Sequence, residues 1–152
     1  MEPLTMALIA AGISAGTQAI GAGLERRAGS QAAAEAFTEE EGRRAANKLL
    51  ATRKKFTALV AANDLMALGC YDELAAAGLK CPDDSSVVGF DDMPFAGKFN
   101  PPLTTIQTPL LDVGAEAARI LLDQIDNPDT PARSIKLRPE LIVRESTGGV
   151  AS

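Results

Sequence analysis

The residues best suited to chemistry are polar side chains that follow two apolar runs. Asn63 and Asp64 come directly after the run 56–62, and Asp91 and Asp92 come directly after the run 86–90. Carboxylates accept hydrogen bonds from hydroxyl groups, and an amide both donates and accepts. The set is rich in acceptors and poor in positive charge, so it suits a neutral, hydroxyl-rich ligand such as a sugar or nucleoside.

Each of these side chains also has a structural interpretation. Asp64 could cap a helix that begins there, and Asp92 could brace the backbone of its loop. Asn63 and Asp91 are needed for neither role, so they are the strongest candidates for ligand contacts. Four further side chains complete the predicted ligand-binding set: Asp64, Asp92, Thr105 and Gln107.

Two other chemistries remain open at the aspartate pair. Asp91 and Asp92 could hold Mg²⁺, although no phosphate loop or further carboxylate accompanies them. Asp91 could also serve as the general base of an enzyme that acts on a sugar. We predict no catalytic residue, no metal and no cofactor.

Composition removes several classes of site. The chain has no histidine, which excludes Ser/His/Asp catalysis and every His-ligated metal site. Its two cysteines, Cys70 and Cys81, lack CxxC spacing and are expected to be free thiols of a reducing cytoplasm. Residues 56–152 are strongly acidic, whereas nucleic-acid affinity rests on clustered Lys and Arg, so the visible chain is expected to bind DNA poorly.

The elements that must position these residues alternate between helices and apolar strands. Thr38 and Glu41 have the spacing of a helix-starting capping box. Helical periodicity or an N-terminal capping residue predicts three helices, over 39–52, from Asp64 to Gly78 and over 112–125. Apolar runs predict strands over 56–62, 86–90, 103–106, 134–137 and 141–144.

This alternation predicts an α/β fold with a mostly parallel sheet flanked by helices and wound by right-handed crossovers. Ligands bind such sheets outside the carboxyl ends of the strands. The runs 56–62 and 86–90 are joined by one crossover helix, so their polar ends should meet at one edge.

Residues 1–36 are predicted to be an atypical lead-in, partly helical and poorly ordered, ahead of one α/β lobe over 37–152. No charged residue occurs between Leu4 and Leu24, but glycines and polar residues make this stretch a weak membrane span and a poor export signal. Its glycines do not have the GxGxxG spacing of a dinucleotide site.

Several segments match one known family in order and spacing. Residues 58–69, 74–78 and 86–92 resemble the effector-binding core of LacI/GalR transcription regulators. Residues 101–106, 114–122 and 141–147 resemble the C-terminal segments of that family. The likeness covers about residues 37–147, and its motifs agree in register.

The resemblance implies one lobe of a periplasmic-binding-protein-like type I fold, in which two α/β lobes close on a small effector, usually a sugar or related small metabolite. The positions that match Asn63 and Asp91 contact the effector in that family, and the lobes form a homodimer. Effector binding changes the lobe arrangement and so the spacing of two DNA-binding heads on an operator, which is allosteric coupling.

No helix-turn-helix pattern and no first lobe precede the matching segments. The resemblance therefore implies a cytoplasmic regulator that recognises operator DNA only through a headpiece missing from this chain. We expect the chain alone to bind effector weakly or not at all and to bind no operator. Three other functions stay open: a solute-binding component of a sugar transporter, a sugar-acting enzyme, and a fragment that forms mixed dimers with intact regulators.

Overall fold

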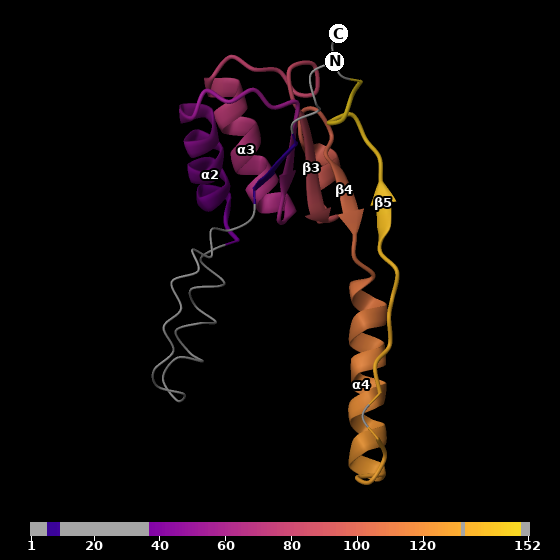
Figure 1. Cartoon of the computed structure of the whole chain (residues 1–152). Helices are drawn as coiled ribbons and strands as arrows, with labels where there is room; N and C mark the ends of the chain where they lie inside the picture. Colours follow the sequence, from indigo (N-terminus) through magenta and orange to yellow (C-terminus); the bar gives the residue numbers. More distant parts are fainter. Residues whose placement is uncertain (1–5, 10–36, 132, 150–152) are drawn as a thin grey trace, which may run out of the picture.

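The computed structural model describes residues 6–9, 37–131 and 133–149 (Figure 1). The order of elements follows the chain, with one short 3₁₀ helix, η1, between β3 and β4. The bounds are β1 Met6–Ile9, α2 Glu39–Ala51, β2 Ala58–Ala61, α3 Asp64–Ala76, β3 Ser86–Asp91, η1 Ala96–Lys98, β4 Thr104–Gln107, α4 Leu110–Asp126 and β5 Glu140–Ile142.

The five strands form one sheet in the order β1-β2-β3-β4-β5. Strands β1 to β4 pair in parallel, and β5 pairs antiparallel to β4. Helices α2 and α3 lie together on one face of the sheet (Figure 1). The predicted mostly parallel α/β fold is therefore confirmed, with one antiparallel edge strand.

The core lies between this sheet and the helix pair. Leu59 and Val87 point from the strands into it and meet Met66 and Leu74 of α3, all of them at most 1% exposed. Burial of such side chains is the main force that holds the helices on the sheet. The apolar runs 56–62 and 86–90 thus contribute to one compact core.

Two glycines let α2 and α3 pack backbone to backbone. A methyl group at Gly42 would collide with the backbone of Met66, and one at Gly69 would collide with the backbone of Glu39 and Arg43. Because the blocking atoms belong to the main chain, they cannot rotate away. The close crossing of the helices therefore requires glycine at both positions.

Helix α4 projects away from this body, and the segment after it runs back alongside to β5 (Figure 1). We call residues 108–139 the arm. No residue of α4 is buried, and Leu111 is 90% exposed. A shallow pocket between helix and return segment has six lining residues: Val113, Glu116, Ala117, Ile120, Ile135 and Leu137. Among the described helices, none is long and apolar enough to cross a membrane.

The structure corrects two sequence expectations. The predicted strand over 134–137 is wrong, because this segment lies along α4, beyond the end of β4, where it has no strand to pair with. Met6–Ile9, assigned to the lead-in, forms the edge strand β1 against β2. The rest of the lead-in, residues 1–5 and 10–36, lies outside the described residues.

Candidate functional site

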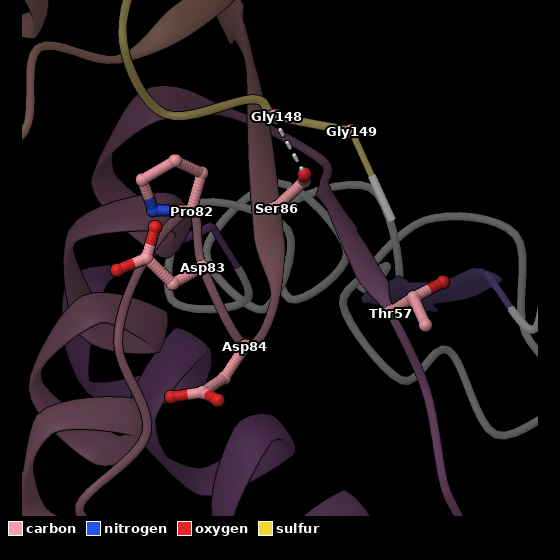
Figure 2. A pocket seen from close by; sticks show the side chains of 7 residues that line it. All are labelled: Thr57, Pro82, Asp83, Asp84, Ser86, Gly148 and Gly149. Atoms are coloured by element: carbon pink, nitrogen blue, oxygen red, sulfur yellow. Dashed lines mark hydrogen bonds between the residues drawn. The ribbon is translucent and has the colours of Figure 1, made fainter. Parts of the chain in front are cut away.

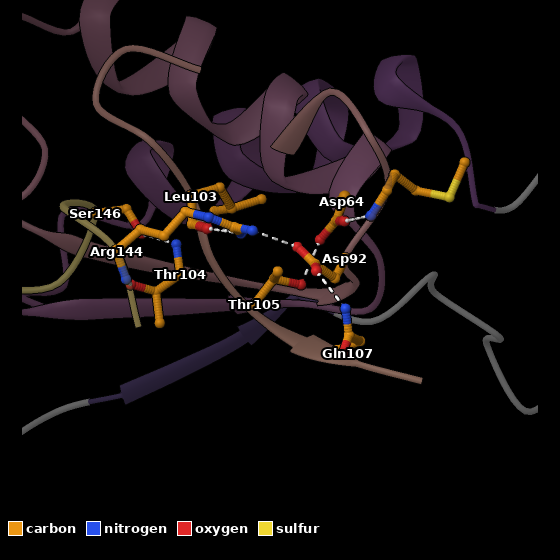
Figure 3. A network of polar contacts seen from close by, with 9 residues as sticks. Asp64, Asp92, Leu103, Thr104, Thr105, Gln107, Arg144 and Ser146 are labelled. Atoms are coloured by element: carbon orange, nitrogen blue, oxygen red, sulfur yellow. Dashed lines mark hydrogen bonds and ion pairs between the residues drawn. The ribbon is translucent and has the colours of Figure 1, made fainter. Parts of the chain in front are cut away.

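The carboxyl ends of β2, β3 and β4 bring the predicted site residues to one edge of the sheet. Strands β2 and β3 are direct neighbours, and Asp91 is in register with Gln107 of β4. Figure 3 shows the polar network that joins these strand ends. The expected meeting of the two polar strand ends is confirmed as geometry.

Asn63, and not Asp64, caps helix α3. Its backbone is extended, and its side-chain Oδ1 accepts a hydrogen bond of 2.8 Å from the amide of Met66. Its Nδ2 donates to the carbonyl of Phe37 over 3.0 Å. The capping role expected for Asp64 was therefore wrong by one residue, since the cap must precede the first helical residue. Asn63 remains partly exposed at the sheet edge.

Asp64 points into the protein and joins three segments. It is fully buried, and it accepts hydrogen bonds from the Thr105 hydroxyl at 2.6 Å and the Met93 amide at 2.7 Å. Gly89 makes room for this carboxylate, because a methyl group there would collide with it and with Leu103. Asp64 and Thr105, which is also 0% exposed, are internal braces in this conformation.

Asp92 is paired on both of its oxygens. Its Oδ1 forms a 2.7 Å ion pair with Arg144, and its Oδ2 accepts a 2.9 Å hydrogen bond from Gln107 (Figure 3). Arg144 also donates to the carbonyl of Leu103 at 2.8 Å. A carboxylate neutralised in this way has little capacity left for a ligand.

Asp91 is the exception among the four aspartate and asparagine candidates. In the described part of the chain its half-buried carboxylate has no hydrogen-bond or ion-pair partner. Burial, and then the charge of Asp64, raise the pKa of Asp91 above its ordinary value. Its backbone is left-handed, with φ of 104°. Asp91 is thus an acceptor at the sheet edge that is free to take a ligand.

Apolar side chains border this edge. Phe37 and Leu65 flank Asn63, and Phe90 and Met93 flank the aspartate pair; each of the four is between 37% and 39% exposed. Polar acceptors beside apolar surface are the usual lining of a small-molecule site. In the described residues no group of three or more Cys, Asp or Glu side chains is arranged to hold a metal ion.

Sequence reasoning missed two side chains that build this region. Arg144 pairs with Asp92, and Ser146, fully buried, accepts from the amide of Thr104 and donates to the carbonyl of Val87. Both lie in the segment 141–147, for which the sequence predicted a strand over 141–144 and a family resemblance but no site residue. A charged residue directly after an apolar run was the one signal that could have identified Arg144.

A second pocket lies at the opposite edge, where β2 and β3 begin (Figure 2). It has a volume of about 160 Å³ and seven lining residues: Thr57, Pro82, Asp83, Asp84, Ser86, Gly148 and Gly149. Ligand pockets for small molecules usually exceed about 300 Å³. One carboxylate oxygen of Asp84 is already used by the amide of Lys80. At this volume, and with one of its carboxylates already bonded, the pocket is a poor candidate for a sugar site.

Comparison with known proteins identifies the family. The periplasmic binding protein-like domain matches residues 7–147. The repressor PurR of Haemophilus influenzae Rd is 40% identical over 118 residues, which cover 76% of this chain and 35% of the repressor. The chain belongs to the periplasmic-binding-protein-like domain family, in the form found in LacI/GalR-type transcription regulators.

Solved structures of LacI/GalR-type regulators agree with this assignment. The complex of the regulator CelR with cellobiose is 34% identical with a TM-score of 0.73, and the match covers 93% of this chain and 46% of that one. A regulator from Enterococcus faecium with bound ribose is 32% identical with a TM-score of 0.66, covering 73% of this chain and 41% of that one. The chain spans about one third of the length of curated relatives such as the PurR repressors that it matches.

Proposed function

We propose that this chain is an effector-sensing lobe of a LacI/GalR-type regulator and that it binds a neutral, hydroxyl-rich ligand at the carboxyl edge of its sheet. The observation that carries the proposal is the Asp91 carboxylate, which has no partner among the described residues. Structures of the same family include complexes with ribose, lactose and cellobiose. An ionised carboxylate is a strong acceptor for sugar hydroxyl groups.

Within the predicted set, we propose direct ligand contacts for Asn63 and Asp91. Asn63 caps α3 and donates one N–H to Phe37, which leaves its second N–H for a ligand. The partners of the other four side chains favour indirect roles: Asp64 and Thr105 are buried against each other, and Asp92 and Gln107 are bonded to each other. The exposed faces of Phe37 and Met93 offer apolar surface for the carbon side of a sugar ring. No feature of the edge favours catalysis, and we propose a binding role without turnover.

We expect weak binding, because the family resemblance implies that a second lobe supplies the other half of the effector site. NMR titration of the chain with ribose and with cellobiose measures such binding residue by residue. The chemical shifts of amides around residues 63 and 91 should change on titration. Asp91→Asn should lower the apparent affinity obtained from these changes by about tenfold or more.

The matched control is Asp83→Asn, an exposed aspartate at the opposite edge of the sheet. It should leave the titration unchanged. Two results count against the proposal: shift changes confined to the pocket around Asp83, or micromolar binding by the chain alone that survives Asp91→Asn.

The partners of the longer protein are also proposals. We propose that operator DNA is bound only through a headpiece outside this chain, in the cytoplasm, and that the chain alone gives no specific gel shift. The acidic composition of residues 56–152 supports this. We further propose a homodimer, as the resemblance implies; sedimentation velocity tests it, and a monomer at all concentrations would contradict it.

A further inference from the structure

One carboxylate ties together both strands from which the arm extends. Asp92 accepts a hydrogen bond from Gln107, the last residue of β4, and α4 begins three residues later at Leu110. The other oxygen of Asp92 binds Arg144, which lies two residues after β5, beside the start of β4. Asp92 therefore joins the end of β4, where the chain leaves for the arm, to the segment that follows β5 (Figure 3).

This side chain belongs to the segment that carries Asp91. Asp91 and Asp92 both have left-handed backbones, with φ of 104° and 51°. Residues other than glycine adopt such values at a cost, and they keep them only where the surroundings hold them in place. The holding contacts are the bonds of Asp92 on one side and the bond from the Met93 amide to Asp64 on the other.

The two holding contacts differ in what they join. Asp64 and Thr105 lie within the sheet and its core, so they fix the segment to the body. Arg144 is only 23% exposed and Asp92 only 11%, so their ion pair is shielded from solvent and stronger than one on the surface. It connects the segment to the chain that follows β5, the strand on which the arm returns to the sheet. Helix α4 itself has no buried residue.

We propose that Asp92, Arg144 and Gln107 are positioning residues that hold the Asp91 carboxylate at the ligand edge and link its position to the orientation of the arm. The proposal rests on the proposed function in taking Asp91 as the ligand contact. A change in the angle at which the arm leaves the sheet then shifts Gln107 directly and Arg144 through β5, and through Asp92 it shifts Asp91. Ligand binding at Asp91 biases the arm in return, because such coupling is reciprocal.

The first test needs no ligand. We compare the whole chain with Arg144→Gln, Arg144→Lys and the control Arg138→Gln, an exposed arginine on the same return segment. The NOE between the amide proton and the Hα of one residue is strong only when φ is positive. Its intensity at Asp91 and Asp92 therefore reports whether each residue keeps its left-handed backbone. The amide shifts of residues 110–113 report the base of the arm.

In Arg144→Gln we expect the strong cross-peak of Asp91 to be lost, the exchange of the Met93 amide to rise about tenfold to hundredfold, and the shifts of residues 110–113 to move together. Arg144→Lys should restore part of each effect, and Arg138→Gln should change none. A folded Arg144→Gln chain with unchanged backbone signals at residues 91–93 would overturn the proposal.

Gln107→Leu serves if Arg144→Gln does not fold, because Gln107 is exposed and the ion pair stays intact. It should change the HN–Hα cross-peak of Asp92 and the amide shifts of residues 110–113 in the same direction as Arg144→Gln. No change at either place would overturn the proposal. Titration with ribose then separates the two ideas. If Arg144→Gln leaves the backbone signals of residues 91–93 unaltered, the positioning role is refuted. If Arg144→Gln alters them but ribose shifts no amide near Asp91, only the ligand site is refuted.

Discussion

At the scale of single residues, the candidate site separates into one free acceptor and a set of supports. Asp64 and Asp92 are both aspartates at the same sheet edge, yet each has donors for both oxygens, whereas Asp91 has none among the described residues. Residue type therefore does not distinguish their roles. The number of donors that reach each carboxylate does.

The brace between Asp64 and Thr105 should be measurable through stability. Thr105→Val keeps the shape of the side chain but leaves one oxygen of a fully buried carboxylate without its donor. We expect the free energy of unfolding to fall by about 1–3 kcal/mol, measured by urea denaturation. Thr105→Ser keeps the hydroxyl and is the matched control. Equal losses in the two variants would show that the lost contact is packing and not the hydrogen bond.

At the scale of elements, the α2–α3 pair and α4 use glycine in opposite ways. Gly69 lies where two helix backbones meet, and Gly114 in α4 has no atom within 4 Å of the position that a Cβ would take. Both glycines are in helices, where the residue lowers helix stability. Only the first has a packing reason to be there.

Alanine at these two positions should have effects of opposite sign. Gly69→Ala forces α2 and α3 apart, and we expect a loss of about 1–3 kcal/mol in the free energy of unfolding. Gly114→Ala meets no obstacle and should increase the helicity of α4, because alanine is favoured over glycine by about 1 kcal/mol in a helix. Thermal unfolding followed by circular dichroism measures both changes. A Gly69→Ala chain as stable as the wild type would show that the helices do not cross as closely as described.

At the scale of the whole molecule, the body and the arm differ in what holds them. The body has one core between its sheet and the helix pair, whereas α4 exposes a wide apolar surface on the side that does not face the return segment. That surface is formed mainly by four residues: Leu111, Leu121, Leu122 and Ile125. Contiguous exposed apolar surface of this kind is typical of an interaction site.

The independence of the body from this surface can be tested directly. Leu111→Glu with Leu122→Glu should change the free energy of unfolding of the body by less than about 0.5 kcal/mol, because neither side chain is buried in it. The same change should lower the fluorescence of a dye that binds apolar surface. A large loss of stability would mean that α4 packs on the body, in contrast to the described arrangement.

The sequence by itself determined most of the elements and the edge at which the candidate site lies. The capping box at Thr38 is present as a bond from the Glu41 amide to the Thr38 hydroxyl, and four of the five apolar runs became strands within a few residues of their predicted ends. These features depend on local periodicity and on neighbours a few residues away. For the same reason, the meeting of Asn63 with Asp91 followed from strand adjacency alone.

Only the tertiary structure decided which side chains remain free at that edge. Whether Asn63 or Asp64 caps α3 depends on where the first helical turn starts, and the pairing of Asp92 with Arg144 joins residues 52 positions apart. The strand expected over 134–137 had the right side chains but no neighbouring backbone to pair with. Hydrogen-bond partners across the sheet are set by how distant segments pack, and no local pattern encodes that packing.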